Sequence, residues 1–304
     1  MRSCAILLLL LPQILFSDGA FSQGCSDAGF CSAGSMKAGA NINDFSSGFQ
    51  ITEIIGLGEE HVFISTTQIE LKLLTHANGR VNIRAPFTFV SGDLGNNAGF
   101  GDLQVSYTLR KIVNDSLTWA FVAGFKYFSG DSDALNKDDL PLPMPYQTSL
   151  GTNDLIFGVN MFYRKWHFAM GYQRVFGTNK NQFTHKAWNN DTHAVEYFES
   201  GFLERGDDIM MRFQRMVERE KATWTFGLLP IYRLQKDIIE IDSVRVPLNG
   251  SNQLTLNINV GSSMPLSDKS VLKFNLGFPT LFRKVRADGL TRLLVFSSAV
   301  EFKF

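Results

Sequence analysis

The sequence predicts an all-β fold, namely a transmembrane antiparallel up-and-down β-barrel of about 12 strands, with 10 or 14 strands as the alternatives. Three observations predict it. From residue 48 onward apolar residues recur at every second position, long and short connections alternate, and the chain ends at Phe304 inside an alternating segment. Successive side chains of a strand point to opposite faces, so this spacing indicates strands with one apolar and one polar face.

The alternation is clearest in residues 102–110 and 253–260, where Leu, Val, Tyr and Ile alternate with polar residues. The apolar faces carry large Phe, Tyr, Trp and Leu side chains, and the opposite faces carry small and charged ones. A soluble β-sandwich has no reason to combine these features with sorted loops. The expected strands are 48–58, 61–75, 80–90, 100–111, 116–128, 151–164, 165–177, 207–218, 221–233, 252–262, 269–280 and 291–304.

The connections between these segments fall into two classes. Every second connection is short, as at 164–165, whereas 129–150, 177–206 and 235–251 are long. Barrels of bacterial outer membranes keep short turns on the periplasmic side and long loops outside. Most segments also reach the ~9–11 residues that a tilted membrane-spanning strand needs.

Composition excludes several other classes of protein. The 304 residues include 29 Lys+Arg and 29 Asp+Glu, which argues against a basic nucleic-acid-binding protein and against an acidic disordered chain. No apolar run of ~20 residues follows residue 16, so a multispan helical membrane protein is also excluded. The alternation accounts for a mean hydropathy of −0.02, and the barrel exterior accounts for the 27 Phe.

The N-terminal residues indicate export. Residues 1–22 are the expected signal peptide, because Arg2 precedes an apolar run and Ala20-Phe21-Ser22 fits a cleavage site with small residues. Cleavage there leaves Cys25 and Cys31, for which we expect a disulfide, with two free thiols as the alternative and lipidation of Cys25 as a further one. The Gly-, Ala- and Ser-rich residues 23–47 either plug the lumen or form a periplasmic tail.

The last segment, 291–304, ends in an aromatic residue that follows apolar residues at alternating positions, with Ser298 as the departure. It resembles the final strand of Gram-negative outer-membrane β-barrels, which the barrel-insertion machinery recognises. The resemblance implies localisation in the outer membrane of a Gram-negative bacterium after signal-peptide cleavage, with outer-membrane lipid and the insertion machinery as partners. The insertion signal it implies comprises Phe296, Val300, Phe302 and Phe304.

Two shorter matches point in the same direction. Residues 24–31, GCSDAGFC, are similar to the mature N-terminus of outer-membrane proteins from Bacteroidetes-type bacteria. Gly99-Phe100-Gly101-Asp102-Leu103, followed by an alternating strand, is similar to a segment of the transporter family named after the phenol-degradation meta-pathway protein. This second resemblance implies a barrel that works as a channel.

With the apolar faces outward, the inward positions carry charges of both signs. Because each unpaired ion costs several kcal/mol to desolvate, such a lumen holds water or a dense ion-pair network. It is therefore either a solute pathway or a static plug of salt bridges. The lumen-lining candidates are Glu70, Lys72, Arg84, Asp102, Arg110, Lys126, Asp154, Asp208, Arg212, Glu218, Lys221 and Lys273.

We therefore expect a channel or transporter through which an unidentified small molecule passes passively, with no enzyme activity, cofactor, metal or nucleic-acid partner. One alternative is a hydrolase at the extracellular rim. In it, Asp131 and Asp133 would face Asp191 and His193, an arrangement that resembles the omptin proteases, where such groups activate water. The other alternative is a structural or adhesion barrel without flux.

Overall fold

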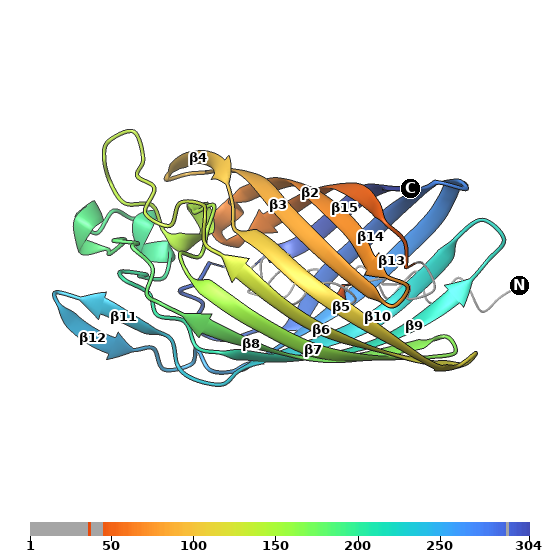
Figure 1. The fold of residues 1–304 in the computed structure, drawn as a ribbon. Coiled ribbons are helices and arrows are strands. Elements are labelled where there is room, and N and C mark those ends of the chain that lie inside the picture. The colour runs from red at the N-terminus through yellow and green to blue at the C-terminus, as the bar shows by residue number, and fades with distance from the viewer. Residues whose placement is uncertain (1–35, 38–44, 290–291) are drawn as a thin grey trace, which may run out of the picture.

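The chain folds into a closed antiparallel β-barrel (Figure 1). The structure is a computed structural model that describes residues 36–37, 45–289 and 292–304. The predicted signal peptide at 1–22 and the cysteine pair Cys25 and Cys31 lie outside the described residues. The barrel wall consists of β1 (Gly48–Gly58), β2 (Phe63–His76), β3 (Gly79–Gly92), β5 (Leu103–Asn114), β6 (Leu117–Tyr127), β7 (Asn153–Tyr163), β8 (Trp166–Phe176), β9 (Asp208–Glu218), β10 (Thr223–Arg233), β13 (Leu254–Ser267), β14 (Ser270–Leu281) and β15 (Arg292–Lys303).

Each wall strand pairs with its neighbours along the chain, and the ring closes between β1 and β15. These two strands run antiparallel from Gly48 opposite Lys303 to Leu57 opposite Leu294. A closed ring pairs the backbone N–H and C=O groups of every wall strand with those of a neighbour, as a hydrocarbon environment requires. The predicted all-β, antiparallel up-and-down barrel with 12 strands is confirmed.

Three short strands are additional to the twelve wall strands. β4 (Gly95–Phe100) pairs with the second half of β3, and β5 pairs with its first half, so β4 and β5 share one place in the wall. The sequence predicts one strand over 100–111 here, whereas the structure interrupts it at residues 101–102. β11 (Ile238–Ile241) and β12 (Val244–Pro247) form a separate hairpin between β10 and β13. The described part of the chain contains no helix long and apolar enough to span a membrane.

Short turns and long loops lie at opposite ends of the barrel, which we call the turn end and the loop end. Residues 77–78, 115–116, 164–165 and 268–269 are two-residue connections at the turn end. The long connections that follow β6, β8 and β10 all lie at the loop end, on the left in Figure 1. β1 begins and β15 ends at the turn end, as an even number of strands requires.

The two faces of the wall differ as the alternation predicts. On β5, Val105 and Leu109 face outward and are exposed, whereas Ser106 and Thr108 face inward and are buried. The outward face includes Phe296, Val300 and Phe302 of β15, three residues of the predicted insertion signal, and Phe304, which directly follows β15, is exposed. The large exposed apolar side chains thus form the outer surface of the barrel, where lipid would cover them.

The apolar outer surface predicts how much a charged side chain placed on it would lower the free energy of unfolding. We expect Leu228→Arg, at the middle of β10, to lower the free energy of unfolding by about 2–4 kcal/mol, because the guanidinium would sit at mid-membrane depth. Leu234→Arg, just beyond the loop end of β10, is the matched control, with an expected loss of about 0–1 kcal/mol. Urea unfolding of both variants in lipid vesicles measures the difference. Equal losses would contradict the membrane placement.

Candidate functional site: the barrel lumen and its loop end

The lumen is lined mainly by buried polar and charged side chains. Ten of the twelve predicted lumen residues are buried or partly buried; Asp102 lies between β4 and β5, and the other nine lie on wall strands. The six buried residues are Glu70, Lys72, Lys126, Asp154, Asp208 and Arg212. The four partly buried residues are Arg84, Asp102, Arg110 and Lys273.

For Glu218 and Lys221 the prediction is wrong. Lys221 lies in the turn between β9 and β10, and Glu218 is the last residue of β9, so both are exposed to solvent at the turn end. The carboxylate of Glu218 lies 3.5 Å from the ammonium of Lys165, and both side chains are more than half exposed. The strands end earlier than the alternation suggests, and these charges stand outside the lumen.

Near the turn end, the lumen charges pair across neighbouring strands. The Lys72 ammonium on β2 lies 2.6 Å from the Glu301 carboxylate on β15, and Lys273 on β14 also pairs with Glu301. Glu70 accepts a hydrogen bond of 2.6 Å from the Asn82 amide on β3. Glu70 also forms an ion pair with Lys37, which lies outside the wall strands.

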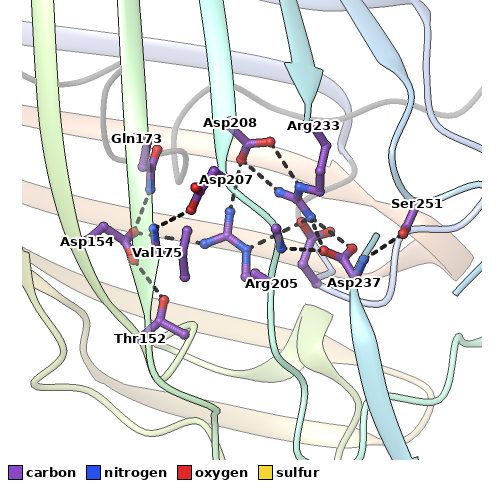
Figure 2. Close-up of polar contacts among 12 residues, drawn as sticks. Thr152, Asp154, Gln173, Val175, Arg205, Asp207, Asp208, Arg233, Asp237 and Ser251 are labelled. Carbon is purple, nitrogen blue, oxygen red and sulfur yellow. Dashed lines mark hydrogen bonds and ion pairs between the residues drawn. The ribbon is translucent and has the colours of Figure 1, made fainter. Parts of the chain in front are cut away.

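At the loop end, a larger network of ion pairs occupies the lumen (Figure 2). Its hub is Arg233, the last residue of β10, whose buried guanidinium lies 2.8 Å from Asp208 and 2.9 Å from both Asp237 and Asp288. Arg283 also binds Asp288, at 2.8 Å. We call this set the mouth network; its members are Asp102, Lys126, Asp154, Arg205, Asp208, Arg233, Asp237, Arg283 and Asp288.

The mouth network connects opposite sides of the ring. Lys126 on β6 lies 3.0 Å from Asp154 on β7, and Asp154 lies 3.9 Å from Arg205, which precedes β9. Arg205 lies 3.7 Å from Asp288, which belongs to the loop between β14 and β15. β6 and β14 are six places apart in the ring of 12 strands, so these pairs span the lumen from wall to wall.

The long loops also pack over the loop end. Met144, Leu203, Ile239 and Ala287 come from four different connections and form one buried apolar cluster. A Cβ at Gly289, whose φ is +63°, would lie 2.4 Å from the backbone nitrogen of Pro145, so this position requires glycine. Loop residues therefore cover the loop end and hold the mouth network beneath them.

Two tyrosines fix the largest loops to each other. The hydroxyls of Tyr146, between β6 and β7, and Tyr197, between β8 and β9, are 3.1 Å apart and buried. Burial raises the pKa of both phenols, since it disfavours the phenolate. Phe183 is fully buried in the same cluster, so these aromatic residues pack the loops against the barrel rather than face a ligand.

One side of the lumen is apolar, which the sequence analysis missed. Val122, Ile156, Met210, Leu229 and Ile231 form a buried cluster on the inner wall. They lie on β6, β7, β9 and β10, and their signal in the sequence was a local loss of alternation, as at Met210-Met211 and Leu228-Leu229. We call these five residues the apolar stripe.

A cavity of about 80 Å³ lies beside the mouth network. Asp102, Lys126 and Asp288 of that network line it, together with Arg84 of β3 and Arg292 of β15. Hydroxyl and amide groups of β2, β3 and the loop after β6 complete its polar lining, and apolar side chains such as Ile64 and Val90 line the rest. The arrangement can hydrogen-bond a small polar molecule or water, and it contains no arrangement specific to one reaction.

The four predicted rim residues do not assemble into a hydrolytic site. Asp131, Asp133, Asp191 and His193 are all exposed, and no hydrogen bond joins the first pair to the second within the described residues. Instead, Asp191 accepts hydrogen bonds from the backbone amides of His193 and Ala194, which is an ordinary turn contact. The described residues also contain no group of three His, Cys, Asp or Glu that could hold a metal ion.

The fold and the lined lumen define a class of protein, the closed outer-membrane-type β-barrel. Among solved structures the chain is similar to the COG4313 outer membrane channel from Pseudomonas putida F1, with 12% identity and a TM-score of 0.59 over 87% of this chain and 99% of that one. It is also similar to the NanC porin, with 7% identity and a TM-score of 0.51 over 84% of this chain and 100% of that one. No family model and no curated protein matches the sequence.

The hub of the mouth network yields a stability prediction. We expect Arg233→Ala to lower the free energy of unfolding by about 3–5 kcal/mol, because it removes a guanidinium partner from three buried carboxylates at once. Arg215→Ala is the control: Arg215 faces outward, lies 4.9 Å from the Trp166 ring centroid, and contributes about 0.5–1 kcal/mol. Urea unfolding measures both, and a loss for Arg233→Ala no larger than the control would contradict the role of the hub.

Asp288 gives a pH prediction. Burial by itself raises the pKa of Asp288, but the guanidinium groups of Arg283, Arg233 and Arg205 outweigh burial and hold that pKa well below its ordinary value. A depressed pKa stabilises the fold above the unfolded-state pKa of about 3.9, and the stabilisation is lost only as the pH falls through the folded-state pKa. The stability difference between the wild type and Asp288→Asn should therefore be largely retained at about pH 4 and should fall as the pH drops further towards the folded-state pKa, as melting experiments would show. A difference that does not change with pH below about 4 would mean an ordinary pKa, because a carboxyl that titrates alike in both states adds no pH dependence to stability.

Proposed function

We propose that this protein is a passive outer-membrane channel for an unidentified small polar molecule. The closed 12-strand barrel with a polar, charged inner wall is the observation that carries the proposal. The sorted turns and loops support a periplasmic turn end and an extracellular loop end. The two solved barrels that it resembles in fold are described as an outer membrane channel and a porin.

The wall of β13 and β14, which adjoins the apolar stripe at β10, favours a pathway over a static plug of salt bridges. Asn257 and Asn259 of β13 and Asn275 of β14 face inward and are neutral. The ion pair of Lys273 with Glu301 lies nearer the turn end. The Nδ2 atom of Asn257 and the Oδ1 atom of Asn259 are buried and have no hydrogen-bond partner among the described residues. Buried amide atoms need a partner, and water or a passing solute supplies it. We call these three residues the amide wall.

Glycine at Gly277, opposite Asn259, leaves the space that such a path needs. A Cβ at this position would lie 2.9 Å from the Asn259 amide nitrogen, and no other atom of the described residues is within 4 Å. Gly261 of β13 also faces the lumen, two residues after Asn259. Small residues therefore line the amide wall, while the bulky apolar residues lie on the neighbouring part of the wall, from β6 to β10.

Two short sequence resemblances extend the proposal to the bacterial origin of the protein and to the transporter family it is related to. The match of residues 99–103 to the phenol-degradation meta-pathway transporter family, and of residues 24–31 to Bacteroidetes-type proteins, supports a transport role in such a bacterium. In the structure, residues 101–102 form the break between β4 and β5, where the Asp102 carboxylate lies 2.9 Å from the Lys126 ammonium. A rim hydrolase receives no support from the exposed positions of Asp131 and Asp191.

Conductance in planar lipid bilayers tests the proposal. We expect the purified protein to give discrete conductance steps and the Asn257→Leu/Asn259→Leu variant to reduce them several-fold, because two apolar side chains would replace the amides that solvate the path. Ile258→Leu, on the outward face of the same strand, is the control and should conduct like the wild type. Absence of conductance and of liposome swelling in all three proteins would overturn the channel.

A further inference from the structure

Met36 lies inside the barrel although it belongs to no wall strand. Its side chain is fully buried, and it packs with all five residues of the apolar stripe in one cluster. These five apolar side chains face the lumen, where an exposed apolar surface would contact water. Met36 covers them, so part of the inner wall is complementary to a residue from the N-terminal side of the barrel.

Two glycines make room for the Met36 side chain. Gly158 of β7 and Gly171 of β8 are direct partners in the sheet, and both face the lumen. A Cβ at Gly158 would lie 2.0 Å from the Met36 sulfur, and a Cβ at Gly171 would lie 3.2 Å from it. Any larger residue at Gly158 would displace the thioether. The pair forms a recess in the wall that the Met36 sulfur fills.

The next residue contacts the opposite side of the lumen. The ammonium of Lys37 pairs with the carboxylate of Glu70 on β2, whose side chain is 1% exposed. β2 is four places from β7 and six from β9 in the ring of 12 strands, so the consecutive residues Met36 and Lys37 contact nearly opposite parts of the wall. Neutralising or displacing Lys37 would leave a buried carboxylate with only part of its partners.

A third contact holds the chain closer to the turn end. Phe45 packs against Ala120 and Phe162 on the inner wall. The guanidinium groups of Arg80 and Arg110 lie 4.6 and 4.5 Å from the centroid of its ring, within the range of cation–π contacts. Three described residues that precede β1 therefore make specific contacts with the inside of the barrel.

We propose that the lumen contains a docking site whose occupant is the chain's own Met36 and Lys37, and that undocking of these two residues widens the solute path. The site consists of the Gly158–Gly171 recess, the apolar stripe around it, and Glu70 across the lumen. The inference rests on the proposed channel function, since a docked segment regulates a path only where a path exists. Within the described residues none of these contacts involves the amide wall, which forms the narrow route that remains.

Single-channel conductance of the full-length protein tests the docking. The Met36→Ser/Lys37→Ser variant removes both contacts and alters no wall strand, so the barrel should fold as in the wild type, as shown by its heat-dependent mobility in gels. We expect its conductance to rise several-fold. Lys165→Ser, in the exposed turn between β7 and β8, is the matched control and should leave conductance unchanged. Equal conductance of all three proteins would overturn the docking while the channel stands, and absence of conductance in all of them would overturn the channel itself.

A charge exchange separates docking from a general loss of charge. Lys37→Glu and Glu70→Lys each place like charges together, so each should undock the segment and raise conductance. The double variant restores an ion pair in the opposite sense and should return conductance toward the wild-type value. If the double variant conducts as much as either single variant, Lys37 and Glu70 do not hold the segment and the proposal fails.

Discussion

The pairing of β1 with β15 is the constraint on which the other features depend. It removes both edges of the sheet and leaves each wall strand with hydrogen-bonded neighbours on both sides. Once the sheet is closed, every strand has an outer and an inner face, and its alternate residues must suit lipid and lumen respectively. Closure also limits the lumen to a narrow space, so charged side chains from different strands come within a few ångströms of one another.

This closeness explains how so many charges are buried. Arg233 is fully enclosed, yet three carboxylates surround it, and each of these has a further partner or hydrogen-bond donor. Paired charges of this kind offset the desolvation that each alone would cost. The loops after β8, β10 and β14 bring several of these groups to the loop end. Packing of the loops and pairing of the charges therefore support each other.

The strands, their alternation and the sorting of the loops were predictable because they depend on local spacing. The ion-pair partners of the inward charges could not be predicted, because they depend on which strands are neighbours in the closed ring. Lys72 on β2 pairs with Glu301 on β15 only because the first and last strands adjoin. Glu218 continues the alternation past the point where the lumen ends. The apolar stripe was hidden because residues such as Leu229 have apolar neighbours on both sides in the sequence.

The inner wall thus carries two unlike regions that meet where β10 pairs with β13, and this division bears on how a solute would pass. The region formed by β6 to β10 presents an apolar stripe that Met36 covers, whereas β13 and β14 present neutral amides and glycines. An apolar surface in a wet lumen is stable only when something covers it, and a neutral polar surface needs only water. A mobile occupant such as Met36 therefore belongs on the region of β6 to β10, and a passing solute belongs on the region of β13 and β14. The same division means that withdrawal of Met36 would expose apolar surface, so the docked arrangement is the resting one.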